Sequence, residues 1–111
     1  PSEKEIKLYK SDGNHLRIYN AYNFPNPFIN KTQFSFEVTQ DFDLNLDLYT
    51  LGGRRVWSYK QFNLSTGFHA IDWNGRDSFG KIIANGVYIF RIKVIGKNST
   101  VSYIGKCAKY D

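Results

Sequence analysis

The sequence predicts an all-β protein, a small antiparallel β-sandwich of the immunoglobulin-like type with seven to eight strands and essentially no helix. Three observations predict it. Apolar and polar residues alternate with a period of two, as in residues 34–38 and 42–48. Clusters of Gly, Asn, Asp and Ser separate these runs at short intervals. No window of a dozen residues shows the apolar spacing of an amphipathic helix. A closed barrel is the alternative.

Each expected strand is bounded by a turn signal. The strands are expected at residues 5–10, 15–22, 32–38, 43–50, 54–62, 67–73, 86–95 and 100–109. The separating turns contain residues 11–14, the proline segment, and residues 39–41, 51–53, 65–67, 74–80 with 85–86, and 96–98. In the seventh strand, Arg91 and Lys93 alternate with Phe90, Ile92 and Val94, which is typical of a strand with one buried face.

Two of the three prolines lie in one short segment and are flanked by aromatic residues. Its members are Phe24, Pro25, Asn26, Pro27 and Phe28. Proline fixes φ, lacks an N–H donor and restricts the preceding residue, so a central strand does not pass through this segment. We expect a stiff crossover from one sheet to the other, with Phe24 and Phe28 packed on the core.

Length and composition predict one domain. A chain of 111 residues is long enough for a single core without metal or disulfide help, and 41% hydrophobic with 17% aromatic residues argues against disorder. The one cysteine, Cys107, has no internal partner for a disulfide. We expect one sandwich domain over residues 1–111, with a leading strand pair (1–22), a proline crossover (23–31) and the main sandwich (32–111).

The charge is uneven along the chain. Residues 1–50 carry five Lys/Arg and seven Asp/Glu, whereas residues 51–111 carry ten and three, which together make the net charge of +5. Such a pattern is found in proteins with anionic partners, including nucleic acid, lipopolysaccharide or a membrane surface. A solvated strand face explains the same charges, and no basic run or RNA-binding motif accompanies them. We expect no nucleic-acid partner.

Residues with catalytic potential are few. His15 and His69 each lie among strand residues, and together with Cys107 they match no zinc-ligand spacing. Cys107 lies on the expected last strand, where a small apolar side chain is the ordinary interpretation. We therefore expect no catalytic, cofactor or metal site and no enzymatic activity in this domain.

The segment 72–80 has the oxygen-rich composition of a calcium loop. Asp72, Asn74 and Asp77 lie within six residues, but Arg76 and Ile83 occupy positions where an EF-hand has ligands. Asn and Asp side chains that bond to the backbone two residues later explain the same composition. We expect a structural loop, and calcium binding stays open.

Aromatic residues suggest a stacking platform for a sugar or a single strand, or else the filling of a small core. The candidates are Trp57, Tyr59, Trp73, Tyr88 and Tyr103. We favour the core, because a sandwich of this size needs large side chains. Strict alternation places Val56 and Trp57 on opposite faces, so one of them is expected to be exposed.

Several short motifs in a fixed order carry a family resemblance. They occupy residues 23–28, 32–37, 48–56, 67–69, 71–77 and 83–91. In this order they resemble the Ig-like β-sandwich named after the flagellar hook-capping protein, and more closely the C-terminal domains of Bacteroidota-type proteins exported by the type IX secretion system. Residues 34–37 and 73–77 look most like the C-terminal domain of the gingipain-like sortase of that system.

The resemblance implies a non-catalytic C-terminal sorting or anchoring domain of a secreted or cell-surface protein of a Gram-negative bacterium. Its implied partners are translocon or sortase components or the parent protein's catalytic domain, with possible lipopolysaccharide association. The residues expected to be recognised are Asn74, Arg76, Asp77, Gly86, Val87, Tyr88, Lys106 and Lys109. An edge strand with free backbone groups would also allow docking. Residues 107–111 lack the apolar ending usual in the family.

Two other functions remain open at the level of sequence. One is a carbohydrate-binding or adhesion module, motivated by Trp57, Tyr59 and Trp73. The other is a structural spacer beside a catalytic, peptidase-like domain. In each case we expect a monomeric domain.

Overall fold

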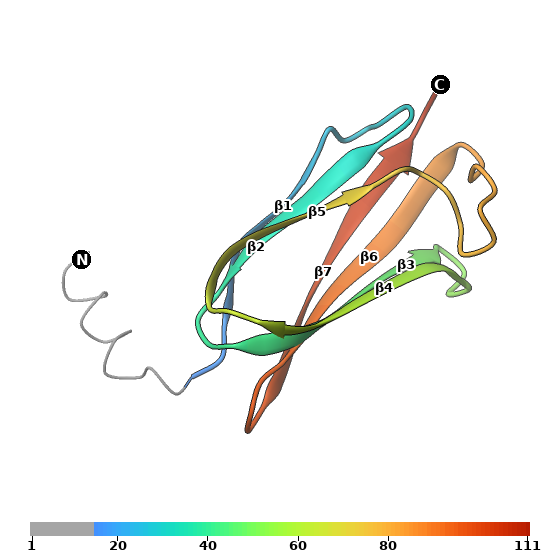
Figure 1. Cartoon of the computed structure of the whole chain (residues 1–111). Coiled ribbons are helices and arrows are strands. Elements are labelled where there is room, and N and C mark those ends of the chain that lie inside the picture. Colours follow the sequence, from blue (N-terminus) through green and yellow to red (C-terminus); the bar gives the residue numbers. More distant parts are fainter. Residues whose placement is uncertain (1–14) are drawn as a thin grey trace.

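The computed structural model describes residues 15–111, which form two packed antiparallel sheets (Figure 1). The strands are β1 (Ile18–Phe24), β2 (Thr32–Val38), β3 (Phe42–Thr50), β4 (Arg55–Leu64), β5 (Gly67–Trp73), β6 (Gly86–Ile95) and β7 (Thr100–Lys109). One sheet has the order β1-β2-β5 and the other β4-β3-β6-β7. The predicted all-β sandwich with seven strands is confirmed, and residues 15–111 contain no helix. The expected strand at 5–10 lies outside the described residues.

The core lies between the sheets and consists of alternate residues of the strands. Phe34 on β2, Leu44 and Leu46 on β3 and Ile92 on β6 are completely buried, whereas their sequence neighbours turn outward. Phe34 packs on Phe90 with a ring-centroid distance of 4.9 Å, which joins the two sheets. The period-two pattern therefore predicts the inward face of these strands correctly.

A β-bulge in β4 breaks the alternation at Val56. Leu48 pairs with Trp57 and Tyr49 with Arg55, so Val56 is the extra residue on its strand. As a result, Val56 is 7% exposed and Trp57 is half-buried against the core, and the expectation that one of them is exposed is wrong. The bulge turns two consecutive side chains toward the same side.

The proline segment does not cross between the sheets, contrary to the sequence-based expectation. β1 and β2 are antiparallel neighbours in one sheet, so residues 25–31 connect a hairpin. The connector nevertheless touches the other sheet: the Phe28 N–H donates to the Ala108 carbonyl at 2.9 Å, and the Tyr110 N–H donates to the Phe28 carbonyl at 3.0 Å. The proline segment is therefore a hairpin loop that bonds to the edge of β7, and not a crossover between the sheets.

The two aromatic residues of this segment have opposite environments. Phe28 is 1% exposed and makes an edge contact with Trp73 at 5.5 Å, as expected. Phe24 is 63% exposed, so the expectation that it packs on the core is wrong. The cause is register: Phe24 pairs with Gln33, whose side chain lies on the outer face of the sheet.

The connections gather at two opposite ends of the sandwich (Figure 1). We call one the proline end, which comprises residues 25–31, 51–54 and 74–85 and the C-terminal end of β7. We call the other the turn end, which comprises residues 39–41, 65–66 and 96–99. The longest connections, 25–31 and 74–85, both lie at the proline end. Binding residues occur mostly on such loops, so this end is the place to look for a site.

Candidate recognition surface

Strand pairing and loop packing bring the predicted recognition residues together at the proline end. Gly86 pairs with Lys109 and Tyr88 with Cys107 across β6 and β7. Asn74 and Arg76 line a pocket of about 320 Å³ together with Lys109. Residues that are 19 to 35 positions apart in the chain therefore share one end of the molecule.

Two of these residues are not accessible. Lys109 is 2% exposed, and its Nζ lies 3.2 Å from Asp111 Oδ2. The hydrogen bonds that Lys109 and Asn85 make to Asp111 hold the pKa of that carboxyl below its usual value. Tyr88 is 7% exposed, and its hydroxyl donates to the Ala84 carbonyl at 2.6 Å. Burial raises the pKa of Tyr88. The expectation that Lys109 and Tyr88 form part of the surface is wrong, because both occupy inward positions.

The accessible part of the set is smaller. Asn74, Arg76, Val87 and Lys106 are exposed, and Gly86 is half-buried. We call these four exposed residues the recognition surface. They present an amide, an apolar side chain and two positive charges, with no carboxylate among them.

The loop 74–85 is held by the turn chemistry that its sequence predicts. Asp77 Oδ1 accepts hydrogen bonds from the N–H groups of Phe79 and Lys81, both at 2.9 Å. Asn74 Oδ1 accepts one from the Arg76 N–H at 3.2 Å. Asp77 Oδ1 thus acts inside the loop, and these bonds are the turn chemistry that the sequence predicts.

Further contacts fix the loop to the sandwich. The indole N–H of Trp73 donates to the Arg76 carbonyl at 2.9 Å, and the Ser78 N–H donates to the Val56 carbonyl at 3.1 Å. Gly75 has φ +73°, and a Cβ there would lie 3.0 Å from the Asn30 carbonyl oxygen. The guanidinium of Arg76 donates to the Gly80 carbonyl at 2.9 Å. The loop therefore presents Asn74 and Arg76 in a defined geometry.

The edge of β7 is covered where it approaches the recognition surface. Asn26 Nδ2 donates to the Lys106 carbonyl, and Asn26 Oδ1 accepts from the Ala108 N–H, both at 3.0 Å. Together with the backbone bonds of Phe28, these contacts occupy the backbone groups that an added strand would need. Docking by strand addition is therefore excluded at residues 106–110. Sequence reasoning did not predict that the Asn26 side chain bonds to β7, because its partners Lys106 and Ala108 are 80 and 82 positions away.

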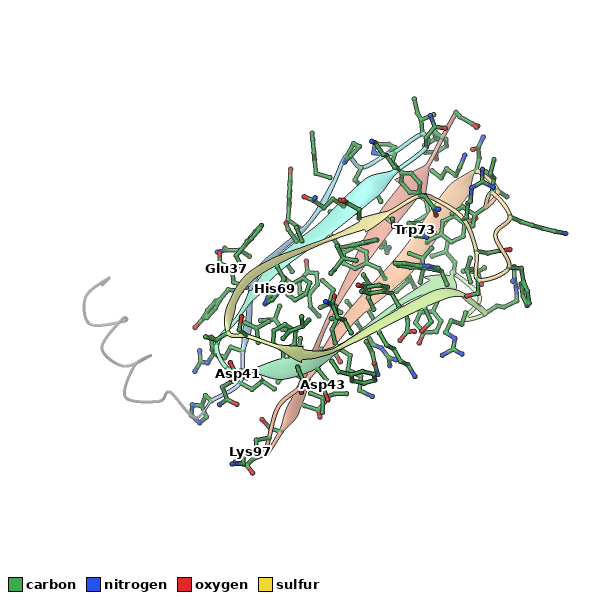
Figure 2. All side chains as sticks on the ribbon, in the orientation of Figure 1. Glu37, Asp41, Asp43, His69, Trp73 and Lys97 are labelled. Atoms are coloured by element: carbon green, nitrogen blue, oxygen red, sulfur yellow. The ribbon has the colours of Figure 1, made fainter. Side chains whose placement is uncertain are left out.

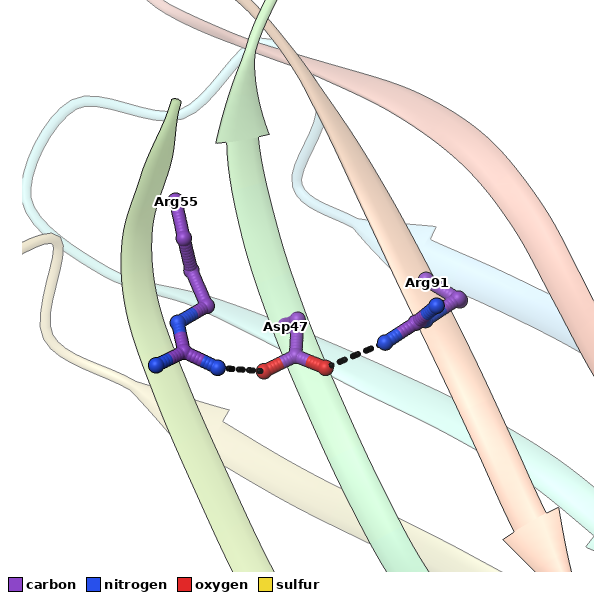
Figure 3. Close-up of polar contacts among 3 residues, drawn as sticks. All are labelled: Asp47, Arg55 and Arg91. Atoms are coloured by element: carbon purple, nitrogen blue, oxygen red, sulfur yellow. Dashed lines mark hydrogen bonds and ion pairs between the residues drawn. The ribbon is translucent and has the colours of Figure 1, made fainter. Parts of the chain in front are cut away.

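The outer face of the four-stranded sheet carries a buried carboxylate between two arginines (Figure 3). Asp47 on β3 is 3% exposed, and its Oδ2 lies 3.0 Å from Arg91 Nη2. The more exposed Arg55 lies 3.9 Å from Oδ1. Arg91 also lies over the Tyr49 ring at 5.8 Å. Asp47 thus balances part of the positive charge on the outer face of this sheet. This agrees with the interpretation that the basic residues belong to the solvated face of a strand.

His69 and Cys107 have structural surroundings. His69 (Figure 2) has its Nε2 2.6 Å from the Ser65 carbonyl oxygen, and its ring contacts the rings of Phe36 and Phe42. Cys107 is 1% exposed, and burial raises the pKa of its thiol to about 12. A thiol that stays protonated at neutral pH is a poor nucleophile.

Within residues 15–111, no three His, Cys, Asp or Glu side chains gather in a way that could hold a metal ion. The same residues include no helix with the length and apolarity of a membrane span.

Most of the candidate platform aromatics fill the core, as favoured above. Trp73 is 3% exposed and stacks on Trp57 at 4.9 Å, while Trp57 and Tyr59 are half-buried. Of the five candidates, Tyr103 is exposed. The other exposed aromatics of the described residues are ones that sequence reasoning missed: Tyr22, Phe24, Phe62, Phe68, Phe79 and Tyr110. Tyr22, Phe24 and Phe68 share the outer face of the three-stranded sheet. The register of β1 against β2 was the signal needed to find them, and alternation within one strand does not contain it.

Comparison with known proteins shows the fold. No protein-family model matches the sequence, and no curated protein is similar to it. Among solved structures, dimeric latent PorU from Porphyromonas gingivalis is similar with a TM-score of 0.73 and 20% identity, over 86% of this chain and 9% of that chain. PorZ, a surface component of the type IX secretion system of P. gingivalis, is similar with a TM-score of 0.55 and 21% identity, over 83% and 12%.

The hook-capping protein FlgD also has this fold. Truncated FlgD from Helicobacter pylori matches with a TM-score of 0.58 and 16% identity, over 81% of this chain and 70% of that chain. The chain thus has a FlgD-like sandwich fold, as the sequence motifs predict. It spans about a tenth of the length of PorU and PorZ, so in those proteins the matching part is a small fraction of the whole.

Proposed function

We propose that this chain is a non-catalytic sorting or anchoring domain of a protein exported by a type IX-like secretion system. The observation that carries the proposal is the fold likeness to PorU and PorZ, of which PorZ is named as a surface component of that system. The agreement extends over more than four fifths of this chain. On this proposal the parent protein reaches the cell surface or the medium of a Gram-negative bacterium.

Recognition on this proposal depends on surface complementarity at the proline end. Asn74 and Arg76 lie on a loop held by Asp77 and Trp73, and Val87 and Lys106 lie on β6 and β7 toward the same end of the sandwich. A rigid loop reduces the entropy lost on binding. The partner would be a translocon or sortase component, and the two positive charges favour an acidic patch on it, or the phosphates of lipopolysaccharide.

The absence of catalysis is part of the proposal. It is supported by the surroundings of the two side chains with most catalytic potential: Cys107 is buried with a raised pKa, and His69 is bonded to the Ser65 carbonyl between aromatic rings.

A reporter fusion tests the proposal. The domain is fused to the C-terminus of a periplasmic reporter enzyme in a host with a type IX system, and reporter activity is measured at the cell surface, in the medium and in the periplasm. We expect export of the fusion and retention of the unfused reporter. A fusion that remains in the periplasm while its sandwich is folded contradicts the proposal.

Surface variants refine the test. An Arg76→Ala, Lys106→Ala double variant should lower export several-fold, whereas Lys97→Ala at the turn end is the matched control (Figure 2). If the double variant exports like the control, recognition lies elsewhere on the domain. If deletion of the domain lowers the stability of its parent but not its export, the domain is a structural spacer.

A further inference from the structure

A second pocket lies at the proline end and adjoins the recognition surface at Asn74. It has a volume of about 560 Å³ and opens where the end of β1, the start of β2 and the end of β5 meet Trp57 of β4. β4 and β5 are edge strands of different sheets, so the pocket lies along the open side of the sandwich. This volume lies in the range of small-molecule sites.

Aromatic rings form two walls of this pocket. On one wall, the 63% exposed Phe24 is extended by Tyr22, whose ring is nearly parallel to it at 8° and 6.1 Å. On the other wall, Trp57 stacks on Trp73 at 4.9 Å and 26°. The exposed rings of Phe24 and Tyr22 are in contact with water, and packing them against an apolar ligand face is favourable. A pyranose ring has such a face, formed by its axial C–H groups.

Polar side chains lie between the aromatic walls. Gln33 Nε2 donates to Asp72 Oδ1 at 2.8 Å, and both side chains are exposed and line the pocket together with Asn74. This bond holds the pair in place. An amide and a carboxylate together offer donors and acceptors beyond the bond they share, which suits the hydroxyl groups at the rim of a sugar ring.

The charge of the pocket narrows the ligand class. Lys31 and Asp72 are the charged residues that line it, so their charges balance. A nucleic-acid strand calls for an excess of positive charge along its backbone, and a lipid chain calls for walls without amide and carboxylate groups. We propose that this pocket binds a neutral saccharide, with Phe24 under the ring and Gln33 and Asp72 on its hydroxyls.

The two tryptophans make the site observable. The whole chain has two, and both line this pocket. Tryptophan emission is measured while the protein is titrated with maltotetraose, cellotetraose, mannotetraose or chitotetraose, with dextran sulfate as an anionic comparison. We expect a saturable change with at least one neutral tetrasaccharide that persists at high salt. In the ¹H–¹⁵N spectrum, the shifted signals should include Phe24, Gln33 and Asp72.

Substitutions decide the outcome. Phe24→Ala and Gln33→Ala should each weaken binding about tenfold, which corresponds to the loss of one good stacking or hydrogen-bonding contact. Both side chains are exposed, and a thermal melt checks that the variants fold. Phe68→Ala is the matched control, because Phe68 is an exposed aromatic on the same sheet face toward the turn end. No saturable change with any of the four sugars overturns the proposal, as does binding that survives both substitutions or is restricted to dextran sulfate.

Discussion

The two ends of the sandwich are tied together in different ways. At the turn end, the Thr66 N–H donates to Asp41 and the Thr66 hydroxyl donates to the Val38 carbonyl, and these hydrogen bonds span 25 and 28 positions. At the proline end, Asn26 bonds to β7 over 80 and 82 positions. These turn-end hydrogen bonds join two connections that pass between the sheets, 39–41 from β2 to β3 and 65–66 from β4 to β5. The bonds of Asn26 at the proline end instead require the first hairpin and the last strand to be in place together.

This difference explains where the candidate sites lie. Short turns at one end leave little surface beyond the strands. At the other end, the loops 25–31 and 74–85 are long and are held by contacts with β7, β4 and Trp73. A loop that is both long and fixed can present side chains in a stable arrangement. Both the recognition surface and the saccharide pocket lie there.

The largest effect is expected from Phe28, which anchors the proline end in the core. Phe28→Ala removes a 1% exposed ring that contacts Trp73, and it should lower the free energy of unfolding by about 3–5 kcal/mol. Phe24→Ala, in the same segment but 63% exposed, should change it by no more than about 0.5 kcal/mol. Urea unfolding of the two variants checks this. Equal losses would show that the segment is not anchored through Phe28.

The second effect is a loss of stability at alkaline pH that originates at the proline end. Burial raises the pKa of Cys107 from 9.0 to about 12, so the folded state keeps the thiol neutral where the unfolded chain ionises. The stabilisation is complete below pH 9 and is lost as pH rises toward 12. Unfolding free energy should fall by up to about 1.4 kcal/mol per pH unit in this window.

A Cys107→Ala variant isolates this contribution. Its unfolding free energy should fall less steeply above pH 9 than that of the parent, because the lysine and tyrosine titrations are common to both. In the native parent, the thiol should also react with a disulfide reagent far more slowly at pH 8 than in denaturant. Fast modification of the folded protein would contradict the buried position of Cys107.

Sequence reasoning reached the strands and the core but not the long-range ties. The alternation that buries Phe34 and Leu46 is local, so one strand contains all the information needed. Val56 does not follow the alternation, because the bulge arises from the pairing of β3 with β4. Sequence reasoning places Phe24 on the wrong face, because its face is determined by its partner Gln33. The role of Asn26 depends on carbonyl and amide groups of β7, which any residue type would supply, so no sequence pattern marks it.

A smaller effect is expected from the loop carboxylate. Asp77→Ala removes the acceptor of two backbone N–H groups and should cost about 2 kcal/mol, as for hydrogen bonds to a charged group. Asp41→Ala at the turn end removes the acceptor of the Thr66 N–H and should cost less, about 1 kcal/mol. Thermal and urea unfolding give both values. If Asp77→Ala costs no more than Asp41→Ala, the loop at the proline end is no better fixed than a simple turn.

The smallest effect tests the tie between the first hairpin and the last strand. Asn26→Ala leaves the Lys106 carbonyl and the Ala108 N–H without their side-chain partner, and because these groups are near solvent the cost should be about 1 kcal/mol. Asn98→Ala, in the exposed 96–99 turn, is the control and should be within about 0.5 kcal/mol of the parent. Hydrogen exchange gives the location: protection of the Ala108 and Tyr110 amides should fall in Asn26→Ala, because the Phe28 backbone bonds depend on the same docking. Unchanged protection at those amides would mean that Phe28 alone holds the segment on β7, and that the long-range tie is made by packing rather than by the Asn26 side chain.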